Sequence, residues 1–491
     1  MKNILRYALT ICAAGLLAGG CTSNFDEYNT NQNQMEMGDI HPLNLLEHIL
    51  FTGADGMVYR TWLLNNELVQ YTVQMYTENV HRYMIRDSYN SGTWNHLARW
   101  AANADHMIEQ AVKNEDVNSE AIALTMRALF VSNWTDIYGD IPFSEAFQGR
   151  NNVLKPKFDT QKEVYTQLFA DLERANSLYD SSRALRYPNK DLMYAGDIAK
   201  WRKFTNSLHM RLLMRLQNRD AETGVGEKLR EIVSNPTLYP VMASNADNAA
   251  LFYTNVDPFI GHFGTMTLQS FTSNSHRMAE HLVNMMNNIN DPRLGIYAVQ
   301  QNNEWTGLVS GYPTTETNAT NCAYLNKDVL GDYTSPYAFM RYDEVLFILS
   351  EAAFRGMIPG GSAAAQQYYE QAVLASIDYW DEINPSPTYE ITQAQKNAFM
   401  EIVAFDNTLE QILNQKYIAL FWVGYEAWHE YRRTGYPNLK IGKGTANDGV
   451  LPTRFIYPVT TVDTNHENYL KAIANQGPDN MKTRLWWARK Q

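Results

Sequence analysis

Cysteine is scarce in this 491-residue chain, which contains only three, and no stretch of the sequence concentrates lysine and arginine. Cys12 and Cys21 belong to the N-terminal segment described below, which leaves Cys322 without a partner for an intramolecular disulfide. We therefore expect the hydrophobic core, rather than cross-links, to stabilise the fold. The same scarcity excludes metal sites built from several cysteines.

The charge balance excludes another class of function. The chain has 41 lysines and arginines against 53 aspartates and glutamates, and its formal net charge is −12. Contacts to phosphate groups need clustered basic side chains, so nucleic acid is not an expected partner.

The motifs of common catalytic sites are also missing. The stretch His429–Arg433 lacks the second histidine of a metalloprotease helix, and no Gly-x-Ser-x-Gly elbow is present. Residues 435–443 do not have the spacing of a phosphate-binding loop. We expect a binding protein without cofactor or metal, not an enzyme. A glycoside hydrolase that uses two of the 53 acidic residues is the enzymatic alternative.

The N-terminus has the pattern of a secretory signal. Lys2 and Arg6 precede an apolar run at residues 7–18, and small residues lead directly to Cys21. This pattern predicts that residues 1–20 are removed and that Cys21 is acylated, as in a bacterial lipoprotein. A secreted protein with a coincidental cysteine is the alternative. The apolar run is too short to span a bilayer as a stable helix.

The polar residues 21–40 lack periodicity and predict a flexible tether. Beyond them, apolar residues recur at three- and four-residue steps, which predicts an α-helical protein. The expected helices include residues 95–113, 119–134, 341–357 and 363–380. The last two form a helical hairpin of about tetratricopeptide size. Further helix pairs are expected over 93–131, 159–216 and 396–431.

Local signals refine these expectations. Thr160 and Glu163 form a capping box, and Asp197 is placed to cap the next helix. Turn residues at 136–142 interrupt the early helices. The section at about 220–340 is rich in turn residues, with one helix expected from His276 to Asn288, and residues 451–491 are expected to be loop-like.

Several side chains are expected to serve the core rather than a site. The helix stripe of Trp201, Phe204 and Leu208 is apolar, and Trp486 with Trp487 is expected to pack. Two arginines lie on an otherwise apolar helix and are expected to pair with buried acids; they are Arg211 and Arg215.

A series of motifs runs in order through nearly the whole chain. They are Phe25–Asn31, Asp136–Phe143, Lys157–Tyr165, Gly196–Leu208, Asp291–Leu294, Glu351–Gly356, Glu426–Gly435 and Leu451–Pro458. Each is weak alone, but the complete series resembles the SusD/RagB family of outer-membrane nutrient-binding lipoproteins.

The resemblance implies a mostly α-helical, SusD-like fold with four tetratricopeptide-like helix pairs. It implies a single domain at 41–491 with a loop-rich, ligand-binding insertion at about 220–340. The implied function is capture of an oligosaccharide at the outer membrane, facing the cell exterior, and its transfer to a SusC-like TonB-dependent transporter. The alternatives are a peptide as cargo, and a tetratricopeptide scaffold without a soluble ligand.

Candidate ligand-binding residues lie in two places. The resemblance implies that an aromatic residue near Trp94, just before a helix, lines the site, and Arg82 and Tyr83 lie upstream of it. Trp305 and Tyr312 lie among polar residues of the loop-rich section, where rings and neighbouring amides suit sugar recognition.

Three weaker candidates complete the set, namely Asn302, Asn303 and His276. For each of these residues the alternative is a structural role, as a core side chain, a helix plug or a fixed loop residue.

Overall fold

The computed structural model describes residues 41–75, 80–273, 276–315 and 321–490. The expected signal peptide at 1–20, Cys21 and the tether at 21–40 lie outside these residues. The chain divides into a unit that ends at His41 and a second unit, Pro42–Gln491. Everything below concerns the second unit.

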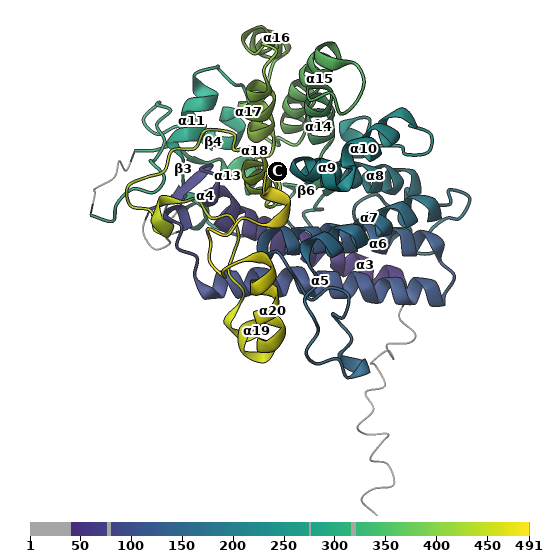
Figure 1. Cartoon of the computed structure of the whole chain (residues 1–491). Helices are drawn as coiled ribbons and strands as arrows, with labels where there is room; N and C mark the ends of the chain where they lie inside the picture. The colour runs from purple at the N-terminus through teal and green to yellow at the C-terminus, as the bar shows by residue number, and fades with distance from the viewer. Residues whose placement is uncertain (1–40, 76–79, 274–275, 316–320, 491) are drawn as a thin grey trace, which may run out of the picture. The chain divides into compact units, whose positions relative to one another are not determined.

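Helices dominate this unit, as expected (Figure 1). The longer ones are α3 (Pro42–Arg60), α5 (Asp87–Lys113), α6 (Val117–Tyr138), α7 (Gln161–Leu178), α8 (Ile198–Arg215), α10 (Val225–Ser234), α11 (Glu280–Asn287), α14 (Tyr342–Phe354), α15 (Gly361–Glu382), α16 (Gln393–Ile402), α17 (Leu409–Ala419), α18 (Glu426–Thr434) and α20 (His466–Gln476). The shorter ones are α4 (Asn66–Leu68), α9 (Asp220–Thr223), α12 (Leu294–Tyr297), α13 (Lys327–Leu330) and α19 (Val459–Thr464).

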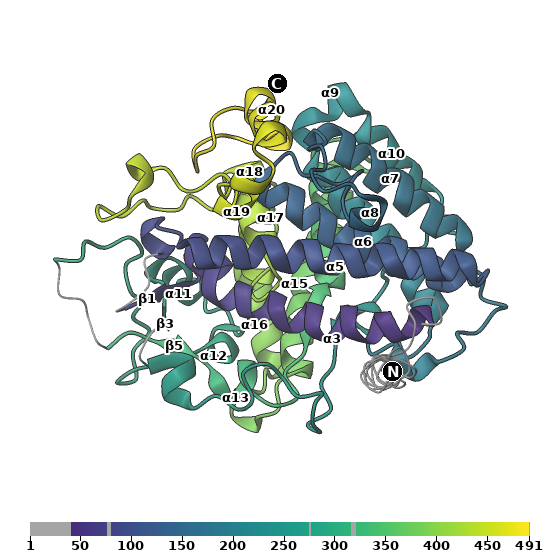
Figure 2. The ribbon, with the colours of Figure 1, turned by 90° about the horizontal axis from the view of Figure 1, so that it is seen from below.

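Consecutive helices pack in pairs. The pairs α5–α6, α7–α8, α14–α15 and α17–α18 each lie in contact, which agrees with the expected tetratricopeptide-like hairpins. α6 contacts α7, α8 contacts α14, and α14 contacts α17, so the pairs form one continuous scaffold. The first long helix, α3, lies along α5 (Figure 2).

The expected capping signals are confirmed. Thr160 and Glu163 make both hydrogen bonds of the capping box at the start of α7, and Asp197 accepts from the backbone N–H of Lys200 at the start of α8. The expected break after α6 begins later than the sequence indicates. The helix continues to Tyr138 and ends at Gly139, whose φ of 91° suits glycine.

The core confirms the roles expected for the apolar stripe of α8 and for its arginines. Trp201, Phe204 and Leu208 are fully buried, as is Trp487, while Trp486 is half-buried. Arg211 pairs with Glu344 of α14, and Arg215 pairs with Glu426 of α18 and Asp136 of α6. These buried ion pairs join helices that are far apart in the sequence.

Two small sheets lie within the loop-rich section and beside α4. The first has the order β1 (Thr72–Gln74), β3 (His276–Met278), β5 (Tyr324–Leu325) and β4 (Ala298–Val299), and all its neighbours are antiparallel. The second pairs β2 (Ala249–Leu251) with β6 (Tyr337–Met340). The first sheet matters for function, because β1 and β3 lead directly to the pocket described below.

Three local expectations are wrong. The helix expected from His276 begins only at Glu280, because residues 276–278 pair with strands on both sides. Trp94 lies inside α5 rather than before it, since that helix already begins at Asp87. The expected loop at 451–491 contains α19 and α20, and the side chains of Ala472 and Gln476 are buried against the rest of the chain.

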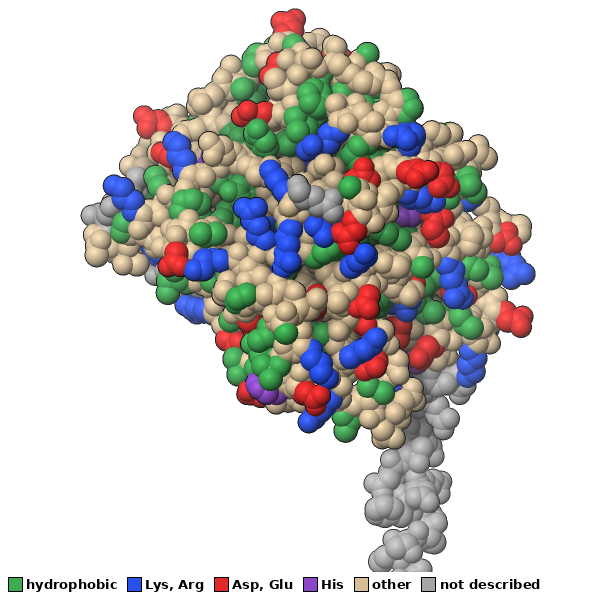
Figure 3. All heavy atoms as spheres, in the orientation of Figure 1, with side chains coloured by type: hydrophobic (Ala, Val, Ile, Leu, Met, Phe, Trp, Pro, Cys, Tyr) green, Lys and Arg blue, Asp and Glu red, His purple; other side chains and the backbone are tan. Residues whose placement is uncertain are grey.

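The surface is mixed in character on the face drawn in Figure 3. Acidic and basic side chains are interspersed there with small groups of apolar ones. None of the helices described here is both long and apolar enough to cross a bilayer.

Candidate functional site

The candidate site begins where three backbone segments meet without intervening side chains. A Cβ atom on Gly307 would come within 2.4 Å of the Glu280 backbone, and one on Gly442 within 2.3 Å of the Ser310 carbonyl oxygen. Gly444 donates its N–H to the Gly311 carbonyl at 2.8 Å. Glycines therefore let the start of α11, the segment 307–313 and the segment 440–444 approach closely.

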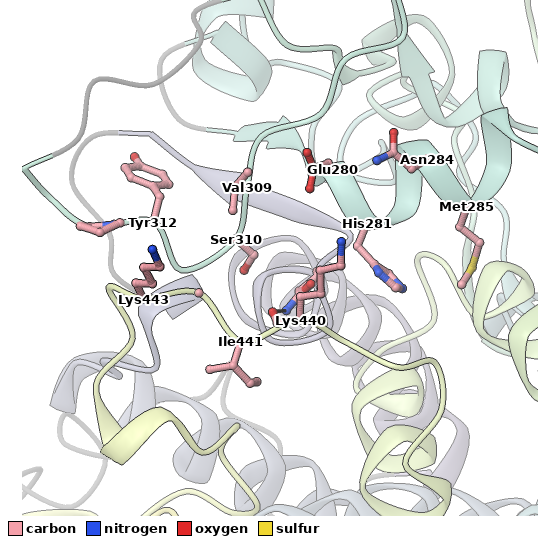
Figure 4. Close-up of a pocket in the computed structure, with 13 residues that line it drawn as sticks. Glu280, His281, Asn284, Met285, Val309, Ser310, Tyr312, Lys440, Ile441 and Lys443 are labelled. Carbon is pink, nitrogen blue, oxygen red and sulfur yellow. Dashed lines mark hydrogen bonds between the residues drawn. The ribbon is translucent and has the colours of Figure 1, made fainter.

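These segments surround a pocket of about 590 Å³ (Figure 4). Its lining residues are Gln70, Glu280, His281, Asn284, Met285, Val309, Ser310, Tyr312, Pro313, Lys440, Ile441, Gly442 and Lys443. We call it the α11 pocket. Tyr312 lies toward one end of it and Met285 toward the other (Figure 4). Its volume falls within the range of about 300–1,000 Å³ that is typical of ligand sites.

The α11 pocket combines apolar surface with unpaired polar groups. Nε2 of His281 has no hydrogen-bond partner within the described residues. Burial, and secondly the positive charge of Lys440, lower the pKa of His281 to about 4, so this imidazole is neutral at pH 7. Asn284 is exposed on α11, one turn beyond Glu280. A neutral imidazole and a carboxamide both donate and accept hydrogen bonds, as a sugar hydroxyl does.

Two of the sequence candidates meet at one wall of this pocket. The Nε of Arg82 donates to the Tyr312 carbonyl at 2.7 Å, and its guanidinium lies 4.3 Å from the centre of the Tyr312 ring. The Tyr312 hydroxyl donates to the Met75 carbonyl at 2.7 Å. Tyr312 is only 5% exposed, so it forms part of the wall and offers little surface to a ligand.

The remaining candidates lie elsewhere. Trp94 is 7% exposed and packs edge-on against Trp134 and Tyr138, so it has the packing role given above as the alternative. His276 is fully buried, and its Nε2 lies 3.1 Å from the side-chain amide nitrogen of Gln74. Burial lowers the pKa of His276 to about 3. Tyr83 is also buried, with a φ of 63°.

The candidates at 302–305 form a separate turn. Asn302 and Asn303 both have positive φ, and Glu304 donates its N–H to the Gln301 carbonyl. Two residues with positive φ in the two-residue loop of a hairpin are typical of a type I′ turn, which favours asparagine. Trp305 follows the turn, is half-buried against the core and does not line the α11 pocket.

A second pocket, of about 380 Å³, lies between α6, α7 and the segment 143–159. Its charged groups are already paired. Arg127 binds Asp105 at 2.5 Å and Asp171 at 2.8 Å, and the Asp159 carboxylate accepts from the Ser144 N–H at 2.6 Å. The α11 pocket is the better candidate site, because its polar groups still have hydrogen bonds to offer.

Metal ligands do not gather in the described part of the chain. No group of three or more histidines, cysteines, aspartates and glutamates is close enough there to hold an ion. Cys322 is buried and burial raises its pKa, which keeps the thiol protonated.

Comparison with known proteins decides the family. A family model described as "Starch-binding associating with outer membrane" matches residues 32–458. The chain belongs to the SusD-like family. A comparison with curated protein sequences finds no match.

Solved structures agree with this assignment to the SusD-like family. A chitin-binding protein is 25% identical, with 91% of this chain and 99% of that chain aligned and a TM-score of 0.79. A SusD homolog from Bacteroides fragilis is 25% identical over 92% of this chain and 100% of its own, with a TM-score of 0.75. A chitin-binding SusD homolog from Flavobacterium johnsoniae shares the fold, at 23% identity and a TM-score of 0.75. The alignment covers 92% of this chain and 98% of that chain.

The sequence analysis missed most of the residues that line the pocket of this SusD-like chain. They are Gln70, Glu280, His281, Asn284, Lys440 and Lys443. One signal was available in Lys440-Ile-Gly-Lys-Gly, a short run of lysine and glycine in an acidic chain. The polar residues of α11 carried no comparable signal, since asparagine and histidine on a helix are typical of any solvated face.

Proposed function

We propose that the chain captures an oligosaccharide in the α11 pocket. The observation that carries this proposal is a pocket of about 590 Å³ on a SusD-like scaffold, in which Nε2 of His281 has no hydrogen-bond partner among the described residues. Apolar side chains of Met285 and Val309 offer surface to the C–H faces of sugar rings, while Asn284 and His281 offer partners for hydroxyl groups.

The comparisons support the carbohydrate class. The family description refers to starch binding, and a structure aligned at 25% identity is that of a chitin-binding protein. Binding without chemistry also fits the scaffold, because stacked helical hairpins provide extended surfaces rather than reactive groups. A binding protein, not a hydrolase, is therefore the function we propose.

We expect Asn284→Leu to reduce affinity for the bound oligosaccharide about five- to tenfold. The variant removes hydrogen bonds to hydroxyl groups from an exposed helix position, where the fold does not depend on the side chain. A glycan array would identify the ligand, and isothermal titration would compare the two proteins.

Asn287→Leu is the matched control, because Asn287 is exposed on the same helix but does not line the pocket. Retention of full affinity by Asn284→Leu, or failure of every glycan on the array to bind, would contradict the proposal. In the second case, mass spectrometry of co-purified ligand would show whether the cargo is a peptide.

We further propose that Cys21 carries a lipid that holds the protein on the outer face of the outer membrane. There it would act as a lid that passes its cargo to a SusC-like TonB-dependent transporter. The family description, which refers to association with the outer membrane, supports this location. A lipid anchor would also raise the effective concentration of the lid beside the channel.

We expect labelled palmitate to attach to the parent protein and not to Cys21→Ser. The variant removes the only thiol available for acylation at the predicted cleavage site. Crosslinking in cells should join the parent to an outer-membrane barrel. Equal labelling of both proteins, or recovery of the parent free in the periplasm without a barrel, would refute the anchor.

A further inference from the structure

The α11 pocket contains two positive charges that the chain does not neutralise. Lys440 and Lys443 both line it, and their ammonium groups rise from the segment 440–443 toward Glu280, Ser310 and Tyr312 (Figure 4). Neither lysine forms an ion pair with any described residue. Ile441, between them, points away from the other side chains (Figure 4).

Several lysines elsewhere in the described chain are neutralised by a neighbouring carboxylate. Lys203 lies 3.0 Å from Asp247, Lys228 lies 2.7 Å from Glu173, and Lys416 lies 2.7 Å from Glu430. The protein as a whole carries a net charge of −12. Two unpaired lysines at one pocket are therefore a local reversal of the overall charge.

The other ionisable groups of the pocket do not cancel these charges. Glu280 is the only carboxylate among the described lining residues, against two ammonium groups. His281 adds no charge at pH 7, because burial and the neighbouring Lys440 keep it neutral. The described lining therefore has one net positive charge, in a concave site where electrostatic interactions are stronger than in bulk water.

We propose that the cargo of the α11 pocket is an acidic oligosaccharide, one whose sugars carry carboxylate or sulfate groups. The inference rests on the proposed function and names its ligand class. An ammonium group is a compact point charge that pairs with either anion, whereas the guanidinium fork of arginine would match a planar carboxylate. Such a ligand would supply the negative partners that the two lysines lack.

The test compares acidic and neutral ligands on the full mature protein. Isothermal titration would use tetragalacturonic acid for carboxylate, a chondroitin sulfate tetrasaccharide for sulfate, and chitotetraose and maltotetraose as neutral sugars. Hexaglutamate would serve as an acidic peptide. We expect one of the two acidic sugars to bind at least tenfold more tightly than either neutral one, with affinity falling as salt is added.

We expect Lys440→Gln and Lys443→Gln each to weaken binding of that acidic sugar about tenfold, since each removes a charge-assisted hydrogen bond. Lys155→Gln is the matched control, because Lys155 is exposed, has no ion pair among the described residues and lies outside the pocket. Which of the two acidic sugars binds more tightly shows whether the pocket recognises carboxylate or sulfate.

The outcomes separate this inference from the proposed function. If a neutral sugar binds as tightly as both acidic ones, the ligand class is wrong. If the lysine variants keep full affinity, the two lysines do not recognise the ligand. Either result overturns this inference, and oligosaccharide capture still stands. If only hexaglutamate binds, the cargo is a peptide and both proposals are wrong. If no probe binds, and a wider glycan array also gives no ligand, both proposals are again wrong.

Discussion

Replacing Arg433 with methionine is expected to lower the free energy of unfolding by about 3–5 kcal/mol. Removing one partner of a buried ion pair leaves the remaining charges buried without a counter-charge. Arg433 is 2% exposed and binds Glu351 at 2.7 and 2.5 Å and Glu430 at 3.0 and 2.7 Å. The pKa of Glu430 lies well below its usual range: burial alone would raise it, but Arg433 and Lys416 stabilise its carboxylate.

The size of this effect follows from what Arg433 connects. Glu351 belongs to α14, Lys416 to α17 and Glu430 to α18, so one guanidinium holds together helices of two different hairpins. Urea unfolding of the parent and the variant would measure the change.

Lys471→Met is the control, because Lys471 pairs with Glu467 on the surface with both side chains mostly exposed. Exposed pairs of this kind contribute little, so no measurable change is expected. A loss below about 1 kcal/mol for Arg433→Met would show that the buried network does not stabilise the scaffold.

Replacing Gly442 with valine is expected to reduce oligosaccharide affinity at least a hundredfold. Its Cβ atom would lie 2.3 Å from the Ser310 carbonyl oxygen and 2.4 Å from that of Gly311, and backbone atoms cannot yield as a side chain can. The segment 440–443 must then move away from 307–313, which opens the α11 pocket and displaces Lys440 and Lys443 together.

The melting temperature should fall only a few degrees, because the contact lies outside the main core. Gly149→Val provides the control, since a Cβ atom at Gly149 would meet nothing within 4 Å. Unchanged ligand affinity of Gly442→Val would mean that the ligand binds away from the α11 pocket.

The helical part of the fold could be predicted from the sequence because its signals are local. The apolar stripe of α8, the capping box of α7 and the hairpin of α14 and α15 each depend on spacings within a few residues. The pairing of Arg211 and Arg215 with buried acids was also expected. Which acids they bind was not, because Glu344 and Glu426 come from distant helices.

The site was harder to predict because its residues converge only in the folded chain. Gln70, α11, the segment 307–313 and the segment 440–443 are far apart in sequence, and close backbone approach at glycines brings them together. Of the aromatic candidates, only Tyr312 lines the pocket.

Trp94 illustrates why a tryptophan beside a helix is a weak signal. It lies in the second turn of α5 and is enclosed by Trp134, Tyr138 and Tyr457. Large aromatic side chains contribute most when they are buried, and a single sequence does not distinguish such a residue from one that faces a ligand.

The most direct test of the central claim is a crystal structure of the mature protein with the oligosaccharide that binds most tightly in titration. The account predicts sugar density between α11 and the segment 440–443, with Asn284 and at least one of Lys440 and Lys443 within hydrogen-bonding distance. Density at the second pocket beside Arg127, with the α11 pocket empty, would contradict it.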